Sequence, residues 1–439
     1  MPELAIPYGR EALALSLPES LDARVLSGRP MPALPDPVAA LREALVDPVG
    51  QRPLKDLCAG KDNAVVVLAD YTRYNAYEVW LPALLEAIQH AGIPPGRISL
   101  YVGSGTHRPM TADEKAACYT PRLCRRFRVL DHDCDAADRM EKAGRTDYGT
   151  ALFVDSRVSD AEVLILTGGI QYHYFAGYTG GRKAVLPSVA GRESICHNHS
   201  LAYDRSRGTF GERVRPGVLV DNPVSEDMHE AAMLLKPDLC VNVVLNAAKE
   251  VAWLGAGDHG YVQRLGAAFL DEHNRLVCDR PADFAIIGAG GYPKDVSLFQ
   301  AHKSLRHTLG ALSPGATIIW VARCTEGEGP DTMAAFRGLV PDGARELLER
   351  EFSLGSLCSF SLKHLSAEYA IHMVTELDPD LVRAWGMTPH SSLDEALSKA
   401  VSAMATEKPW VVGPDMSNLL VEIPAPAVSD GGSDEEQQT

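Results

Sequence analysis

The chain has 439 residues, of which 46% are hydrophobic and 23% are charged, so it is long enough for two or three globular domains. Its 42 Lys and Arg against 58 Asp and Glu give a formal net charge of -16, which argues against nucleic acid as a partner. The nine cysteines contain no Cys-x-x-Cys pair, and no apolar run approaches the ~20 residues of a membrane span. We therefore expect a cytoplasmic enzyme that acts on a small molecule and does not bind a membrane.

The first part of the chain alternates between buried strands and amphipathic helices. We predict strands over 64–69 and 98–102 with a helix over 77–91 between them, which is a βαβ unit. Further strands are expected over 162–167 and 241–245. This alternation predicts an α/β domain with a mostly parallel sheet flanked by helices.

The pattern restarts near residue 278, with strands over 284–287 and 317–321 and a helix over about 296–310 between them. We therefore expect an α/β fold of two domains, each with a mostly parallel sheet, and an active site in the interdomain cleft. The expected division is a catalytic domain over 1–275, a second α/β domain over 276–423 that closes over the site, and a disordered acidic tail over 424–439.

Polar side chains follow four of the predicted strands, where α/β proteins bind their ligands. Asp70-Tyr-Thr-Arg73 follows the first strand, and such a carboxylate and guanidinium can bind a sugar hydroxyl and a carboxylate. Gly103-Ser-Gly-Thr-His107 follows the second strand, and Thr111 to Glu114 is typical of a capping box that opens a helix. Taken alone, these two loops are better explained by a capping Asp, a surface Arg and an incidental His.

The third loop, His173-Tyr-Phe-Ala-Gly-Tyr-Thr-Gly-Gly-Arg-Lys183, is the most informative, and His199 follows sixteen positions after Lys183. It combines a nucleophilic amine and imidazoles with a Gly-rich turn. Ala184 after Lys183 rules out a Walker A loop, which needs Ser or Thr there. A surface turn remains an alternative. A zinc site is also possible in principle but lacks a companion carboxylate or Cys pair; its candidates are His107, His132, His197 and His199.

The fourth loop is Gly290-Gly-Tyr-Pro-Lys294, which follows the strand over 284–287. Gln300 and Lys303 come after it and are three positions apart, so they share one face of the predicted helix. Pro293 stands where a Gly-x-Gly-x-x-Gly fingerprint that starts at Gly288 needs its last Gly. A conventional dinucleotide site is therefore not indicated.

Together these loops resemble the nickel-pincer nucleotide enzymes of the lactate racemase family, over residues from about 60 to 330. The motifs that carry the resemblance are Asp70-x-x-Arg73, Gly103-Ser-Gly-Thr-His107, His173-x-Phe-Ala-Gly-Tyr-x-Gly-Gly-Arg-Lys183, Asn198-His199-Ser200, Gly-Gly-Tyr-Pro-Lys294 and Gln300-x-x-Lys303. The resemblance implies a nickel-binding cofactor, a pyridinium-3,5-bisthiocarboxylic acid mononucleotide. Cofactor-biosynthesis proteins would then be transient partners, and the first domain would bind the cofactor.

The resemblance also implies a role for each matched residue. Lys183 would link covalently to the nucleotide as a thioamide, and His199 would complete the coordination of nickel, a sensible donor for a square-planar metal. The other implied cofactor contacts are Gly180 and Gly181 at the phosphate, Phe175 and Tyr178 near the ring, and Asp70 at the ribose.

The implied reaction is racemisation or epimerisation of a 2-hydroxy acid by reversible hydride transfer to the nucleotide. The α-proton beside an ionised carboxylate is very weakly acidic, whereas removal of a hydride leaves a flat 2-keto acid that can take it back on either face. Each enantiomer needs a base for its hydroxyl proton, and the matched bases are His107 and His173. Arg73 and Lys303 would clamp the substrate carboxylate, with Gln300 as a neutral hydrogen-bond partner.

Three departures from the family pattern favour a different or bulkier 2-hydroxy acid than lactate. Tyr74 and Asn75 follow Arg73 where the family usually has Pro, Phe299 replaces a Tyr, and His302 is expected to add a polar group near the pocket. Two alternatives remain open. One is a nickel-pincer-dependent dehydrogenase that passes the hydride to an acceptor such as NAD, and the other is a binding module without turnover.

Overall fold

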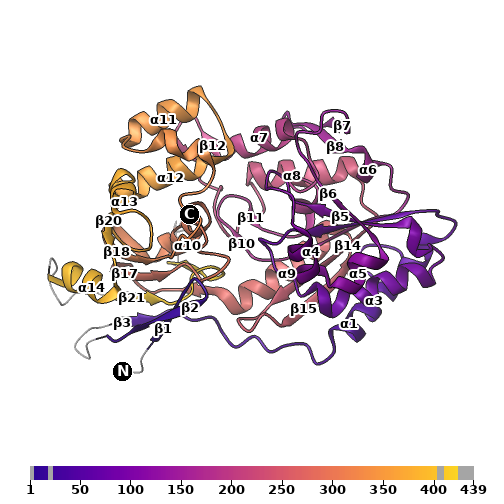
Figure 1. Ribbon diagram of the computed structural model, residues 1–439, viewed down its shortest axis with the longest axis horizontal. Coiled ribbons are helices and arrows are strands. Elements are labelled where there is room, and N and C mark those ends of the chain that lie inside the picture. The colour runs from indigo at the N-terminus through magenta and orange to yellow at the C-terminus, as the bar shows by residue number, and fades with distance from the viewer. Residues whose placement is uncertain (1–3, 18–22, 403–409, 424–439) are drawn as a thin grey trace, which may run out of the picture.

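The protein is described by a computed structural model that covers residues 4–17, 23–402 and 410–423, so the acidic tail expected over 424–439 lies outside the described residues. Two lobes lie side by side, each built around its own sheet (Figure 1). Within these described ranges, no helix combines the length and the apolar character needed to cross a membrane.

The first domain contains a six-stranded sheet with the order β15-β14-β9-β4-β5-β6. The strands are β4 Ala64–Ala69, β5 Ile98–Gly103, β6 Arg128–Asp131, β9 Leu164–Gly169, β14 Leu239–Leu245 and β15 Val251–Gly257. Neighbours pair in parallel except β14 and β15, which are antiparallel. All four predicted strands are confirmed, and β4 is almost wholly buried because helices cover both faces of the sheet.

Helices lie on both faces of this sheet. On one face, Leu41 of α1 and Trp80 of α3 share a core with Val66 of β4, whereas on the other Ile195 of α7 and Met228 of α8 pack with Val67. Neighbouring side chains of β4 thus enter different cores, because successive residues of a strand point to opposite faces of the sheet. The helices are α1 Pro37–Val46, α2 Leu54–Cys58, α3 Tyr77–His90, α4 Ala112–Tyr119, α5 Pro121–Arg126, α6 Ser156–Ser159, α7 Arg192–Ser200, α8 Pro223–Leu235 and α9 His259–Asn274. The predicted capping box opens α4.

The second domain contains a six-stranded, wholly parallel sheet with the order β20-β19-β18-β17-β21-β3. Its strands are β3 Ala23–Val25, β17 Ala282–Gly288, β18 Leu312–Val321, β19 Ala370–Val374, β20 Thr388–His390 and β21 Trp410–Gly413. Its helices are α10 Leu298–Thr308, α11 Pro341–Arg350, α12 Leu354–Glu368, α13 Pro379–Ala384 and α14 Leu393–Ser402. The predicted β17, α10 and β18 are confirmed.

The start of the chain joins the second sheet. Strand β3 pairs with β21, and the hairpin of β1 (Leu4–Tyr8) and β2 (Glu11–Leu15) packs Ile6 against Phe284 of β17. These residues were expected in the first domain, and the difference arises because no local pattern encodes a pairing across almost the whole chain. The boundary near residue 275 stays a prediction.

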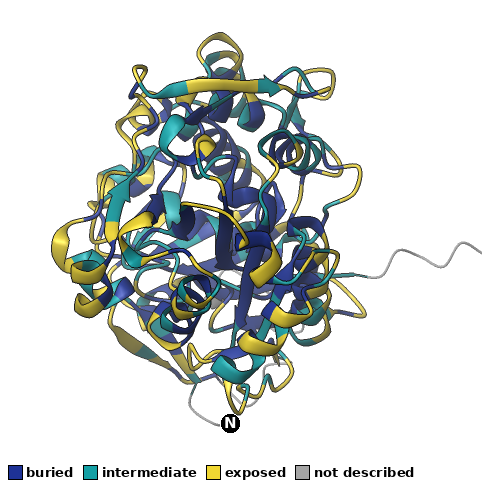
Figure 2. Ribbon diagram, turned by 90° about the vertical axis from the view of Figure 1, so that its right-hand side faces the viewer, coloured by how far each residue is buried: buried dark blue, intermediate teal, exposed yellow. Residues whose placement is uncertain are grey.

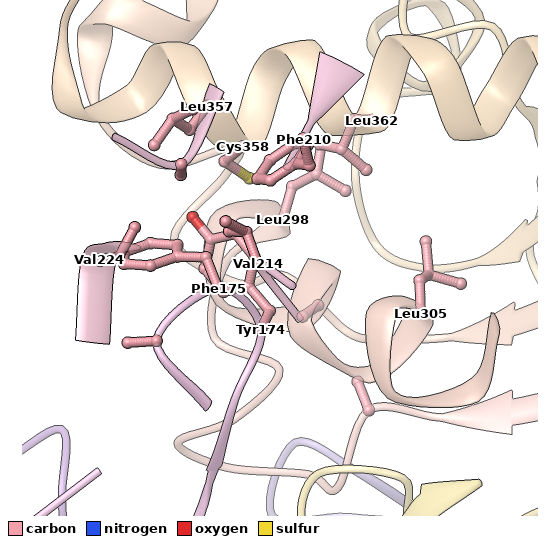
Figure 3. Packing of buried hydrophobic residues seen from close by; sticks show 14 of the residues in the cluster. Tyr174, Phe175, Phe210, Val214, Val224, Leu298, Leu305, Leu357, Cys358 and Leu362 are labelled. Atoms are coloured by element: carbon pink, nitrogen blue, oxygen red, sulfur yellow. The ribbon is translucent and has the colours of Figure 1, made fainter. Parts of the chain in front are cut away.

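One buried cluster connects the two domains. It brings Tyr174, Phe175 and Val224 from the first domain against Leu298 and Leu357 from the second (Figure 3). Buried residues fill the centre of the molecule, and the exposed ones lie on the outer turns and loops (Figure 2). The loop that contains Tyr174 and Phe175 therefore lies in the region where the domains meet.

Candidate active site

The predicted loops converge because three neighbouring strands run parallel. Asp70–Arg73 follow β4, Ser104–His107 follow β5 and the loop over 170–183 follows β9, so all three leave the same edge of the sheet. The second domain adds the first turns of α10. Together they line a cavity of about 140 Å³ that is partly open to solvent. The predicted site residues that line it are Asp70, Arg73, His107, His173, Phe175, Gly180, Lys183, His199, Gln300 and Lys303.

The ring of Phe175 is the common neighbour of the groups that carry the chemistry. The ring centroid of His173 lies 4.5 Å from that of Phe175, and the centroid of His199 lies 4.9 Å from it. Lys183 Nζ lies 5.7 Å from the same centroid. Lys183 belongs to a short 3-10 helix, η2 (Gly181–Ala184), and His199 to the end of α7. The structure thus brings the amine and both imidazoles to one ring.

Two predicted cofactor contacts lie outside the cavity lining. The Tyr178 hydroxyl donates to Asp271 at 2.7 Å, and its ring packs 5.4 Å from that of Tyr172. A Cβ on Gly181 would stand 2.8 Å from Gln263 Cβ, and its backbone φ of +50° favours Gly. Both residues therefore have packing roles behind the loop, and their contact with a cofactor stays a prediction.

Buried amides hold this loop in place. Asn242 of β14 accepts from the Gly181 amide at 2.8 Å, and Gln263 of α9 donates to two carbonyls of the glycine turn at 3.1 and 3.0 Å. Arg182 donates to Gln263 at 2.7 Å and so points away from the cavity that Lys183 faces. Neither amide was expected from the sequence. The available signal was Asn242 itself, a polar residue within an apolar strand.

The states of Lys183 and His199 suit a tethered metal cofactor. Desolvation, reinforced by Arg73, lowers the pKa of Lys183 to about 7, so much of the amine is neutral at neutral pH. Desolvation and the charge of Lys183 lower the pKa of His199 to about 3. Its Nδ1 lies 3.2 Å from Asn198 Oδ1, which leaves Nε2 for a metal. The residues present therefore fit a group that needs a nucleophilic amine and a neutral imidazole.

The zinc alternative is not supported. Across residues 4–17, 23–402 and 410–423, no three or more His, Cys, Asp or Glu side chains are placed to hold a metal ion. His132 Nε2 lies 3.0 Å from the Ala190 carbonyl, and His197 Nδ1 lies 2.8 Å from Thr150 Oγ1. Both imidazoles thus have structural partners. A metal that takes one protein histidine and several cofactor atoms needs no such cluster.

His107 is held by a buried carboxylate. Its Nδ1 lies 2.6 Å from Asp70 Oδ2, and Asp70 Oδ1 accepts from the amide and hydroxyl of Thr72 at 3.1 and 2.6 Å. Desolvation alone would raise the pKa of Asp70, but the hydrogen bonds of His107 and Thr72 and the charges of His107 and Arg73 together lower that pKa. The carboxylate thus fixes the imidazole and leaves Nε2 for the substrate. Both Asp70 oxygens are engaged, and the ribose contact stays a prediction.

His173 has very different surroundings. It is buried, and its Nδ1 accepts from the Ala176 amide at 3.3 Å. Desolvation, followed by the charges of Lys183 and Arg73, holds the pKa of His173 well below its usual value. The imidazole is therefore neutral at neutral pH, and in the empty site it is a weak base.

The cavity attracts anions. Among its described lining residues, Asp70 is the one carboxylate, against Arg73, Lys183 and Lys303. Desolvation and then Arg73 hold the pKa of Lys303 well below its usual value, and its Nζ donates to Gln300 Oε1. That contact confirms that Gln300 and Lys303 share a helix face.

His302 does not contribute to the pocket, so that expectation is wrong. Its Nε2 lies 2.8 Å from Ser361 Oγ on α12, and its ring meets Tyr174 edge-on at 5.0 Å. Two positions along a helix turn a side chain by about 200°, so His302 faces away when Gln300 faces the cavity. Phe299, in contrast, does line the cavity.

These features define a two-domain α/β enzyme with an anion-attracting site between strand ends and α10. The family model of the lactate racemase N-terminal domain matches residues 8–211, and that of the lactate racemase C-terminal domain matches residues 277–421. The chain belongs to the lactate racemase family.

Two relatives show how far the similarity extends. The lactate racemase of Thermoanaerobacterium thermosaccharolyticum is 28% identical over 435 residues, which cover 96% of this chain and 99% of that one. The lactate racemase of Lactiplantibacillus plantarum is 30% identical over 391 residues, 87% of this chain and 90% of the relative. The structure of the T. thermosaccharolyticum lactate racemase apoprotein matches with a TM-score of 0.87 over 96% of this chain and 100% of that one. This similarity supports an isomerase of the racemase type.

Proposed function

We propose that the protein is a cytoplasmic racemase or epimerase of a 2-hydroxy acid that uses a covalently tethered nickel-pincer nucleotide. The observation that carries the proposal is the contact of the Phe175 ring with Lys183, His173 and His199. The amine for the tether, a base and the imidazole for the metal thus all lie next to one ring. Membership of the lactate racemase family supports the racemase type of reaction. The nine free cysteines support a reducing compartment.

Lys183 would carry the nucleotide, and His199 would ligate its nickel. Phe175 would pack beside the ring, and Gly180 would lie near the phosphate. When bound, this group would supply an acceptor for the hydride from C2 of the substrate. The neutral state of Lys183 suits the attachment, because only an unprotonated amine is a nucleophile.

The remaining chemistry belongs to the side chains of the chain. His107, oriented by Asp70, takes the hydroxyl proton of one enantiomer, and His173 takes that of the other. Arg73 and Lys303 hold the carboxylate, so that a flat 2-keto acid would be retained in the cavity. Delivery of a hydride to its other face would invert the carbon.

The proposal is tested on protein expressed together with the cofactor-making genes. Intact mass should show one adduct per chain that is absent from Lys183→Ala, and metal analysis should show stoichiometric nickel. Chiral chromatography should show a single enantiomer converting to an equal mixture while total hydroxy acid stays constant. Exposed Lys61→Ala is the matched control and should retain adduct and activity. Full activity of Lys183→Ala, or keto acid accumulating with NADH, would refute the proposal.

A further inference from the structure

A buried carboxylate outside the described lining of the cavity is linked to the active site through hydrogen bonds. Asp227 of α8 is fully buried, and its Oδ1 accepts from Thr146 Oγ1 at 2.5 Å. Its Oδ2 accepts from Thr150 Oγ1 at 2.8 Å and from Asn198 Nδ2 at 2.7 Å. All three donors are neutral, whereas a buried carboxylate is usually paired with a cation. A carboxylate at this position therefore calls for an explanation beyond packing.

The surroundings of Asn198 determine which way its side-chain amide faces. The oxygen and the NH2 group of an amide have nearly the same shape, so the hydrogen-bond partners decide between the two orientations. Asn198 Nδ2 donates to Asp227 Oδ2 and, at 3.0 Å, to the Val224 carbonyl, and both acceptors belong to α8. A flipped amide would place its oxygen against these two oxygens. The oxygen of Asn198 must therefore face away from α8, where it lies 3.2 Å from His199 Nδ1.

The orientation of Asn198 selects one tautomer of the neutral His199 ring. An acceptor beside Nδ1 favours the tautomer that carries its proton on Nδ1 and its lone pair on Nε2. The Ile195 carbonyl, one turn earlier on α7, also accepts a hydrogen bond from the ring. An imidazole binds a metal through a nitrogen that has a free lone pair, and the partner of its other nitrogen fixes which one that is. The observed orientation of Asn198 therefore leaves Nε2 of His199 ready for a metal.

We propose that Asp227 is a positioning residue of the active site: it orients the Asn198 amide, which in turn holds His199 in the tautomer whose Nε2 binds nickel. The inference rests on the proposed function and deepens it. Asp227 acts only through Asn198, because it lies outside the described lining of the cavity and would touch neither the cofactor nor the substrate. A carboxylate suits this role, since both of its oxygens accept hydrogen bonds and neither donates.

Three substitutions separate this role from a general effect on packing. Asp227→Leu keeps a similar volume and removes both acceptor oxygens. Asp227→Asn can turn its remaining oxygen to Asn198 and its NH2 group to Thr146 Oγ1, so it should preserve the orientation of the Asn198 amide. Thr146→Val is the matched control, because it removes a hydrogen bond to the same carboxylate and leaves the bond between Asp227 and Asn198 in place.

The tautomer is measured first, on the cofactor-free full-length chain at neutral pH. NMR of protein with 15N-labelled histidine rings shows which nitrogen carries the proton, and His199→Gln identifies the signals of His199. The wild type should carry the proton on Nδ1. The ratio of this tautomer to the other should fall at least fivefold in Asp227→Leu and stay unchanged in Asp227→Asn and Thr146→Val. An unchanged ratio in Asp227→Leu would show that the Ile195 carbonyl suffices and would overturn the inference. A wild-type ring protonated on Nε2 would overturn it even if Asp227→Leu does not fold.

Retention of nickel is measured next, on the cofactor-loaded protein in the presence of EDTA. Intact mass reports the adduct on Lys183, and metal analysis follows the nickel that remains. Nickel should leave Asp227→Leu about tenfold faster than the wild type at equal adduct, and Asp227→Asn and Thr146→Val should stay within twofold of the wild type.

Two outcomes of the nickel measurement would overturn the inference. One is an unchanged loss of nickel from Asp227→Leu, and the other is an equally fast loss from Thr146→Val, which would indicate a general loosening of the fold. A wild-type protein without any adduct or nickel would refute the proposed function. In that case, a change of tautomer in cofactor-free Asp227→Leu would still support the orientation of His199 by Asp227.

Discussion

Burial of the Lys183 amine should lower the free energy of unfolding of the cofactor-free protein. In the folded chain its pKa is lowered from 10.5 to about 7, so the unfolded chain binds more protons between about pH 7 and 10.5. Stability therefore rises with pH across this window. At ~1.4 kcal/mol per pH unit, the penalty is ~5 kcal/mol near pH 6 and ~2 kcal/mol at pH 9.

Lys183→Met removes the charge and keeps the length of the side chain. We expect the cofactor-free variant to be more stable than the wild type by several kcal/mol at pH 6 and by less than half as much at pH 9. Urea unfolding of both proteins at the two pH values measures this difference, and exposed Lys61→Met controls for loss of any lysine. A variant that is destabilised at pH 6, or a gain that does not shrink at pH 9, would show that Lys183 is not a desolvated amine.

Three further outcomes follow from the site. In the cofactor-free protein at pH 8, an amine reagent should label Lys183 well ahead of the exposed lysines, because about nine-tenths of an amine of pKa ~7 is neutral there, which peptide mapping will show. Asp70→Asn should lower kcat/KM at least tenfold. The loss should be equal for both enantiomers of a racemised acid, because the two enantiomers have equal free energy. A change confined to KM would show that Asp70 does not orient His107. Asn242→Ala should cost roughly 1–3 kcal/mol in urea unfolding, because it leaves the Gly181 amide without its buried partner.

The sheets and the main site could be predicted because their signals are local. β4 and β17 are short runs of apolar, often branched residues, and polar loops follow them directly. Once β4, β5 and β9 are taken as parallel neighbours, the loops that contain Arg73, His107 and Lys183 must leave the same edge of the first sheet. The resemblance to a family supplied the roles of these residues, which spacing alone did not.

The features that were missed depend on contacts between distant segments. Nothing near β3 indicates that it pairs with β21, and nothing near Asn242 indicates that its amide holds the glycine turn. Lys294 and Gln171 are more than a hundred positions apart, so their hydrogen bond exists only in the folded protein. His302 lies inside the Gln300-x-x-Lys303 motif, which suggests a place near the pocket, but its face of the helix turns it toward Ser361.

The charges of the site imply an order of events. Lys183 lowers the pKa of both His173 and His199, while Arg73 lowers that of Lys183. Attachment of a cofactor through an amide-type bond would remove the Lys183 cation, so the imidazole of His173 would become a stronger base only after attachment. The substrate carboxylate would then meet Arg73 and Lys303 without the Lys183 cation nearby. The same amine that favours attachment thus suppresses the basicity of His173 in the empty protein.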